Sequence, residues 1–232
     1  MDTPAASRNT RPRQLALALG HQESLAREDF LEGPSNTTAL TLIESWPDWP
    51  APVVLLTGPE GSGKSHLATF WAEASGARVI AARALVETPP PATLATGALV
   101  IEDLGEGEFD EASLFHVMNL AREEGAFVLL TARQSPAGWQ VGLRDLASRL
   151  RAVPAVTLAP PDDALLRSVI VKLCADRQLS VDETMVSYLA SRIERSFAAA
   201  RSAVALLDRE ALRQKRAVNR SLAADLFRDA GA

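Results

Sequence analysis

The segment Gly58–Ser65, GPEGSGKS, has the residue types and the spacing that bind the phosphates of a nucleotide. It matches the pattern G-x-x-x-x-G-K-[ST] at every fixed position, and it follows Val53–Leu56, an apolar run typical of a buried strand. Glycines let successive backbone N–H groups converge on phosphate oxygens at the start of the next helix, whose dipole also favours an anion. Lys64 is expected to reach the β- and γ-phosphates and Ser65 to hold Mg²⁺; a plain glycine-rich turn is the alternative. The predicted phosphate-binding loop consists of Gly58, Pro59, Glu60, Gly61, Ser62, Gly63, Lys64 and Ser65.

Two acids and a threonine follow other apolar runs and are candidates for the same site. Glu102 and Asp103 come directly after Ala98–Ile101, and parallel sheets place their ligand sites at the carboxyl ends of strands. In this Walker B interpretation, Glu102 holds Mg²⁺ and Asp103 orients the attacking water; the alternative is two solvated acids in a turn. Thr131 follows Phe127–Leu130 and is expected between the P-loop and the acids, where it either senses the γ-phosphate or only caps the strand end.

Alternating strands and helices must position these residues. Apolar runs predict strands at 53–56, 79–80, 98–101, 127–130 and 153–158. Helical spacing and caps predict helices at 37–44, capped by Ser35 or Asn36, and at 64–74, 110–123 and 143–150. The alternation predicts a parallel sheet. After Pro160–Pro161 only helical spacing recurs, so we expect a flexible tail at 1–22, an α/β nucleotide-binding core at 23–159 and an all-helical lid at 160–232.

The composition narrows the class of protein. The chain has 232 residues, 47% of them hydrophobic and 23% charged, which is typical of a globular protein. Its net charge of −5 provides no general field for nucleic acid. Cys174 is the only cysteine, which excludes a disulfide framework and favours core packing in a reducing compartment. No apolar run has the length of a membrane span and no signal-peptide pattern is present, so we expect a cytoplasmic protein without a membrane partner.

Near the N-terminus, leucine alternates with alanine in Gln14–Leu19. One interpretation is the start of a strand or helix that packs on the core. The other is a short linear motif, in which Gln14 is a polar anchor and Leu15, Leu17 and Leu19 enter an apolar groove on a partner.

Several of these features together resemble the AAA+ ATPases related to the bacterial replication initiator DnaA, and most closely the short Hda-type regulators of that family. The resemblance runs from about Gln14 to the C-terminus, and its most specific string is Asp145–Leu150, DLASRL. Its other supports are Phe30–Gly33 with Asn36, the P-loop, Val100–Asp103, Thr131 and Pro160–Asp162. It implies an α/β fold: an AAA+ P-loop NTPase core with a parallel sheet, followed by a small all-helical lid domain. We expect no dedicated DNA-binding domain, because the chain stops at Ala232 without the helix-turn-helix of DnaA.

The resemblance also implies a regulatory task. In Hda-type proteins a motif Q-L-x-L-x-L binds the DNA polymerase III sliding clamp (the beta subunit), which makes the clamp the expected partner of Gln14–Leu19. Clamp-bound and loaded with ADP, such a protein stimulates ATP hydrolysis by the initiator DnaA and so prevents re-initiation of chromosome replication. The implied cofactors are ADP or ATP with Mg²⁺, and a homo-oligomer is a possible state. Intrinsic ATP hydrolysis is expected to be weak, so the protein acts mainly as an activator of a partner ATPase.

The resemblance also implies roles for single residues. The trans-acting arginine finger of the family falls on Arg149, which would stabilise the γ-phosphate held by a neighbouring protomer. Without the resemblance, a surface arginine paired with Asp145 is the better interpretation. Leu143, Leu146 and Leu150 share one face of the predicted helix and are expected to point inward, with Arg149 at the rim of that face.

Departures from the family pattern favour a nucleotide holder over a fast ATPase. Glu102 stands where DnaA proteins have aspartate, and the sensor arginine of the lid aligns with Ala198, so another arginine must replace it or its function is lost. The predicted nucleotide-binding residues are completed by Phe30, His66 and either Arg195 or Arg201. Arg133 stands where the relatives usually carry aspartate, and the sequence offers no reason for it.

Two other functions stay open at this stage. A helicase-loader-like or other DnaA-related ATPase acting on DNA would share the P-loop and the finger, but it has no use for the Gln14 motif. A small-molecule kinase would share the P-loop alone and would need a substrate-binding insertion that the predicted lid does not contain.

Overall fold

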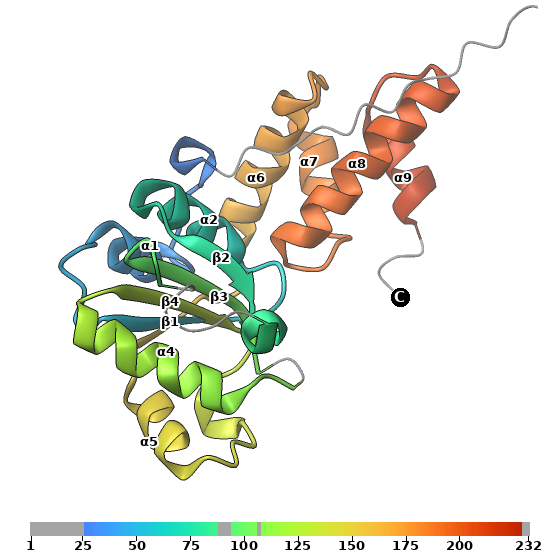
Figure 1. Cartoon of the computed structure of the whole chain (residues 1–232). Helices are drawn as coiled ribbons and strands as arrows, with labels where there is room; N and C mark the ends of the chain where they lie inside the picture. Colours follow the sequence, from blue (N-terminus) through green and yellow to red (C-terminus); the bar gives the residue numbers. More distant parts are fainter. Residues whose placement is uncertain (1–25, 88–93, 106–107, 229–232) are drawn as a thin grey trace, which may run out of the picture.

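The computed structural model describes residues 26–87, 94–105 and 108–228, and Gln14–Leu19 lies outside them. Five parallel strands form one sheet in the order β2-β3-β4-β1-β5 (Figure 1). The strands are β1 (Val53–Thr57), β2 (Arg78–Ala81), β3 (Ala98–Leu104), β4 (Phe127–Ala132) and β5 (Ala155–Thr157). The predicted parallel α/β fold is confirmed.

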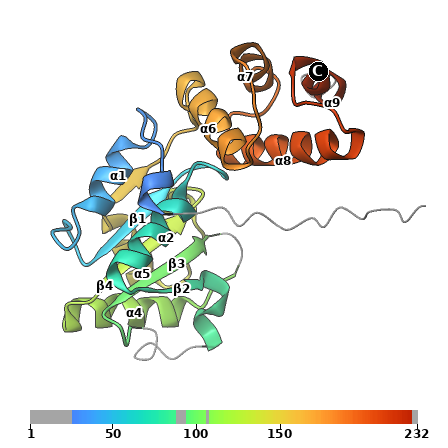
Figure 2. The same cartoon turned by 90° about the horizontal axis from the view of Figure 1, so that it is seen from above.

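Helices cover both faces of this sheet, which explains why its strands are apolar on both sides. The 3-10 helix η2 (Ala82–Glu87), α4 (Glu111–Glu124) and α5 (Arg144–Ala152) pack on one face. The other face packs against α1 (Thr37–Glu44) and α2 (Lys64–Ser75) (Figure 2). Consecutive residues of β1 alternate between the two cores, with Leu55 in the first and Leu56 in the second. Two further 3-10 helices are η1 (Arg27–Asp29) and η3 (Pro136–Gly138).

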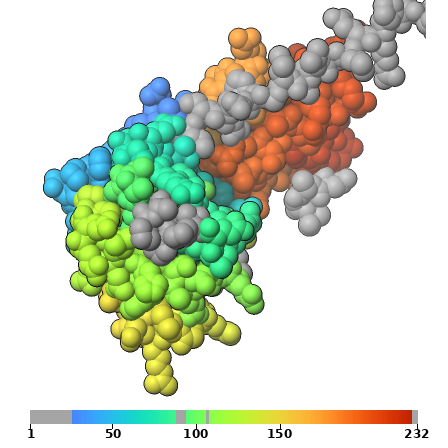
Figure 3. Space-filling view, viewed as in Figure 1, coloured from blue at the N-terminus to red at the C-terminus, as the bar shows by residue number. Residues whose placement is uncertain are grey.

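A separate hydrophobic core holds the C-terminal helices together as a lid (Figure 3, orange to red). These helices are α6 (Asp163–Asp176), α7 (Glu183–Ala190), α8 (Phe197–Gln214) and α9 (Arg220–Phe227). Each begins at a side-chain cap that accepts a hydrogen bond from the backbone N–H three residues on, which satisfies one free donor of the first turn. The caps are Asp162, Asp182, Ser196 and Asn219.

Cys174 of α6 is fully buried in the lid core, as expected from the sequence. Burial raises the pKa of its thiol to about 11, so it is a poor nucleophile at neutral pH. Among the described residues, no helix is both long and apolar enough to cross a membrane.

Three local predictions were wrong in detail. Asn36 is the N-cap of α1, but its side chain accepts from Gly33 N (2.9 Å) and donates to Leu31 O (3.0 Å), so it fixes the preceding segment and does not bond to the helix. Leu143 does not point inward: it is the N-cap of α5 and is 40% exposed, whereas Leu146 and Leu150 are buried.

The third wrong prediction concerns the residues at which two strands begin or end. β5 is limited to Ala155–Thr157 because Val153 ends α5 and Pro154 has no N–H to donate. β3 continues through Glu102 and Asp103, where the pairing with β4 is interrupted between Ile101 and Leu104. The acids therefore lie within the strand and not after it.

Candidate nucleotide-binding site

The P-loop occupies the turn between the end of β1 and the start of α2. Gly58 has φ +150°, and a Cβ at this position would lie 2.5 Å from the carbonyl oxygen of Leu158. Gly63 has φ +102° and is the residue immediately before α2. Since a side chain would be strained or would collide at these positions, the backbone requires glycine, and the loop takes the form that its sequence predicts.

Lys64 is held inside this loop. Its side chain is buried, and its Nζ donates to Gly58 O (2.7 Å) and Pro59 O (2.9 Å). The ammonium group is therefore fixed at the loop where phosphates are expected. Ser65 lies exposed on the first turn of α2, so its hydroxyl is accessible.

Thr131 lies on β4, between the strand that precedes the P-loop and the strand that carries the two acids. β4 lies between β3 and β1, Thr131 is paired in register with Leu56, and its Oγ1 accepts a 3.3 Å hydrogen bond from Asp103 N. Asp103 has φ +60°, an uncommon angle for a residue other than glycine, at the interruption of β3. Thr131 thus lies where we expected it; sensing of the γ-phosphate stays a prediction.

Glu102 provides the one buried carboxylate oxygen without a hydrogen-bond partner among the described residues, its Oε1. A buried polar oxygen of this kind is suited to a ligand, because leaving it unpaired costs free energy. In the described part of the chain, no three or more His, Cys, Asp or Glu side chains are grouped so that they could hold a metal ion by themselves. Mg²⁺ that arrives with a nucleotide needs only one or two protein ligands, so Ser65 and Glu102 fit it, and bound there it would neutralise phosphate charge.

The lid touches the P-loop directly at the start of α8. Phe197 N donates to Gly61 O at 2.9 Å, and a Cβ at Gly61 would lie 2.8 Å from the Cβ of Ala198. Ala198, which the resemblance places at the position of the sensor arginine, therefore lies against the loop but carries no charge. Of the two replacement candidates, Arg195 is 64% exposed and paired with Asp163 at 2.9 Å.

Arg201, the other candidate, lies near enough to His66 of α2 for its charge to affect that histidine. The pKa of His66 is lowered, chiefly by burial and further by the positive charges of Arg201 and Lys172. His66 Nε2 lies 3.0 Å from Ala26 O, and its ring packs edge-on against buried Phe30 at 5.1 Å. Phe30 and His66 thus lie together beside the first turn of α2.

Arg133 is a residue of this site that the sequence did not explain. It follows β4 directly, and its guanidinium is 3.0 Å from the carboxylate of Glu60 in the P-loop. The ion pair is exposed and spans 73 positions of the chain, from 60 to 133. The only signal in the sequence was a basic residue just after a strand that ends at the site.

Arg149 lies at the opposite edge of the sheet. Its guanidinium is 4.7 Å from the ring centroid of Phe115 on α4, and it lines a hollow of about 180 Å³ with Pro52 and Val53. Val53 is the first residue of β1, and the P-loop follows the last residue of that strand. The five residues of β1 separate Val53 from the P-loop by roughly 17 Å. α5 also lies at the end of the molecule away from the lid (Figures 1 and 3, yellow). Arg149 is therefore not part of its own chain's phosphate site.

Comparison with solved structures defines the class of fold. Domain III of DnaA from Thermotoga maritima superposes with a TM-score of 0.71 at 19% identity, over 89% of this chain and 97% of that one. AMPPCP-bound DnaA from Aquifex aeolicus gives 0.65 at 18% identity (82% and 69% covered). The Holliday junction branch migration motor RuvB of Thermotoga maritima gives 0.68 at 15% identity (88% and 72% covered).

No protein-family model matches the sequence, and no curated protein matches it either. The similarity is therefore one of fold. The chain has the AAA+ P-loop NTPase fold: a five-stranded parallel sheet between helices, followed by a helical lid, as in DnaA and RuvB.

Proposed function

We propose that this protein is a DnaA-related, Hda-type AAA+ regulator: bound to ADP or ATP with Mg²⁺ and attached to the DNA polymerase III sliding clamp, it stimulates ATP hydrolysis by the initiator DnaA. The observation that carries the proposal is the position of Arg149. An arginine at the edge of the sheet remote from its own P-loop cannot serve its own nucleotide, and this position supports a role toward the phosphates of a neighbouring protomer. Arginine fingers supplied in trans raise hydrolysis rates by roughly 10³- to 10⁵-fold in known cases.

The phosphate site supports nucleotide binding with slow hydrolysis. The P-loop is complete and Lys64 is held inside it. The residue at the sensor position, Ala198, offers no positive charge to a γ-phosphate, and Arg195 is turned to Asp163. A protein of this kind keeps its nucleotide and presents Arg149 to another ATPase.

The clamp-binding step rests on the pattern of Gln14–Leu19, which lies outside the described residues. It is tested by a pull-down with the sliding clamp. Gln14→Ala and Leu17→Ala are expected to abolish retention of the protein. Retention of both variants at the level of the parent would exclude this segment as the clamp motif.

Arg149→Ala tests the central claim. The variant is expected to keep ADP binding and clamp binding, and to lose at most about 1 kcal/mol of stability, the range of an exposed cation–π contact. It should nevertheless abolish stimulation of DnaA in an ATPase assay with clamp loaded on DNA. Arg144→Ala, an exposed arginine of the same helix, is the matched control and should stimulate normally. If the two variants behave alike, Arg149 is not the finger.

The same ATPase assay distinguishes the proposed regulator from the alternative function, a helicase-loader-like ATPase. A helicase-loader-like ATPase acting on DNA would hydrolyse ATP by itself, with stimulation by single-stranded DNA and no need for clamp or initiator. Turnover of several per second by the protein alone, within the ordinary range for enzymes, would favour that alternative.

A further inference from the structure

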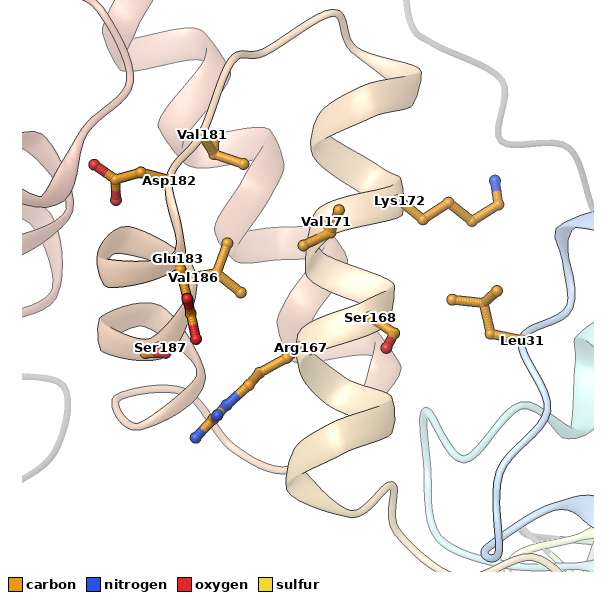
Figure 4. A pocket seen from close by; sticks show the side chains of 10 residues that line it. All are labelled: Leu31, Arg167, Ser168, Val171, Lys172, Val181, Asp182, Glu183, Val186 and Ser187. Atoms are coloured by element: carbon orange, nitrogen blue, oxygen red, sulfur yellow. The ribbon is translucent and has the colours of Figure 1, made fainter.

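A broad groove on the outer face of the lid has no part in the nucleotide site. It has a volume of about 580 Å³ and lies over α6 between the segment that precedes α1 and the start of α7 (Figure 4). Its apolar surface comes from Leu31, Val171, Val181 and Val186. Val171, on the floor, is 48% exposed, although a valine on a lid helix ordinarily packs against a neighbour. Among the described residues, the groove thus offers an uncovered apolar surface.

We propose that this groove binds the chain's own N-terminal segment Gln14–Leu19, which would hold that segment away from the clamp. The proposal about the groove stands alone; only its consequence for clamp binding rests on the proposed function.

The described chain begins at the rim of the groove. Asp29 of η1 is paired with Lys172 at 2.7 Å, and both Lys172 and Leu31 line the groove. The described chain therefore begins beside this rim, at Ala26. The seven residue steps from Leu19 to Ala26 span up to ~23 Å when extended, more than twice the ~8–10 Å between packed helices. The segment can reach the floor of the groove without strain on the fold.

The apolar and charged residues of the segment match those of the groove when the chain crosses α6 from Lys172 toward Asp182. Gln14–Leu19 is uncharged and carries three leucines, which suit the apolar floor, and it follows arginines at positions 8, 11 and 13. Lys172 and Leu31 lie on the side of α6 that faces the segment before α1. Asp182 and Glu183 lie on the other side of the groove, at the start of α7 (Figure 4). A chain that enters at the near rim and runs across Val171 brings its arginines to these two acids.

The charges that face this path come from both helices. The carboxylate of Asp182 keeps its negative charge because hydrogen bonds from Thr184 and Met185 lower its pKa. Lys172 is neutralised by Asp29 and Asp176. Arg167 lies one turn before Val171 near Ser187, at the other end of the groove from Val181 and Asp182 (Figure 4). The positive charge on the floor is thus away from the end where the arginines are expected.

Tethering makes even weak docking effective. A short linker gives an effective concentration of about millimolar, so a contact too weak to detect between separate molecules is populated within one chain. If the groove holds the segment for half to nine-tenths of the time, the apparent dissociation constant for the clamp rises about two- to tenfold.

Disulfide trapping in the full chain tests the docking without any clamp. In the Leu17→Cys, Val171→Cys double variant, copper phenanthroline should form an intramolecular disulfide at least tenfold faster than in Leu17→Cys, Leu212→Cys. Leu212 lies on α8 of the same lid and is 67% exposed, so the control cysteine is at least as accessible. Cys174 is buried, with its thiol pKa raised to about 11, and does not compete. Equal rates in the two variants, or disulfides only between chains, would overturn docking within the chain.

A second measurement separates this proposal from the proposed function. Val171→Arg removes the apolar floor at an exposed position, and it should raise affinity for the clamp about two- to tenfold. Val79→Arg, at an exposed valine of β2, is the control and should leave clamp affinity unchanged. Trapping without any effect of Val171→Arg on the clamp would uphold the docking and contradict the clamp-binding role of the segment; neither effect would overturn the docking itself.

Discussion

The two edges of the sheet are built in different ways. At the carboxyl edge, Lys64, Thr131 and the start of α8 are fixed by hydrogen bonds to the P-loop or to the neighbouring strand, and the lid covers the loop. At the opposite edge, Arg149 is held by a single aromatic ring and lines a small open hollow. The first edge is preorganised to enclose a ligand within one chain. The second presents a guanidinium that makes no ion pair with the described residues, which is compatible with the proposal that Arg149 serves a neighbouring protomer.

The largest expected effect is a loss of nucleotide binding at the carboxyl edge when Lys64 is replaced. Lys64→Ala should abolish ADP binding, measured by calorimetry, because it removes the positive charge fixed at the loop. Lys215→Asn is the control, since Lys215 ends α8 with φ +53° and asparagine tolerates this backbone. Clamp binding of Lys64→Ala should be unchanged. ADP binding by this variant would show that backbone N–H groups alone hold the phosphates.

A smaller effect is expected at the opposite edge, where the ring of Phe115 positions Arg149. Phe115→Leu should lower stimulation of the initiator about two- to fivefold, the equivalent of a cation–π contact of about 0.5–1 kcal/mol. Phe115→Tyr keeps the ring and should stimulate normally. ADP affinity should be the same in both, which distinguishes a positioning defect from a folding defect. Equal stimulation by the leucine and tyrosine variants would contradict a role for the ring.

Arg133 and Glu60 test whether the carboxyl edge depends on charge balance. Arg133→Ala leaves the carboxylate of Glu60 unpaired beside the phosphates and should weaken ADP binding, by at most about fivefold for an exposed ion pair. Adding Glu60→Gln should restore the affinity. If the double variant binds as weakly as Arg133→Ala, the arginine contacts the nucleotide itself and does not act by shielding Glu60.

The smallest effect concerns pH and His66. Its pKa is lowered below 6.5 in the folded protein, so its contribution to stability is present above pH 6.5 and is lost as the pH falls through the folded pKa. Between pH 7 and pH 5 the melting temperature should drop by a few degrees, at about 2–4 °C per kcal/mol for a chain of this size. His66→Gln should show a weaker drop than the parent, while His116→Gln, exposed on α4, should behave like the parent. An unchanged pH dependence in His66→Gln would exclude this histidine.

Local pattern alone was sufficient for most of the fold and for the conformation of the P-loop. Val53–Leu56 followed by Gly58–Ser65 predicted a buried strand, a phosphate loop and a helix, because burial, glycine and helix start are each encoded in consecutive residues. The expectation that Thr131 lies between the acids and the P-loop agrees with the strand order, in which β4 separates β3 from β1; the alternation of strands and helices predicts a parallel sheet but not that order. Local pattern was wrong for Leu143, because helical spacing gives a face but does not say where the helix begins.

Only the tertiary structure decided which distant residues meet. The pair Glu60–Arg133, the contact of Ala198 with Gly61, and the ring of Phe115 under Arg149 each join segments that are far apart in the chain. Such contacts depend on how complete helices and strands pack, through distances and angles that no local period encodes. The sequence by itself determined that a phosphate-binding loop is present, and its resemblance to a family singled out Arg149 as the proposed finger. Packing decided that the loop contacts its own lid at the start of α8 and that Arg149 lies at the opposite edge of the sheet.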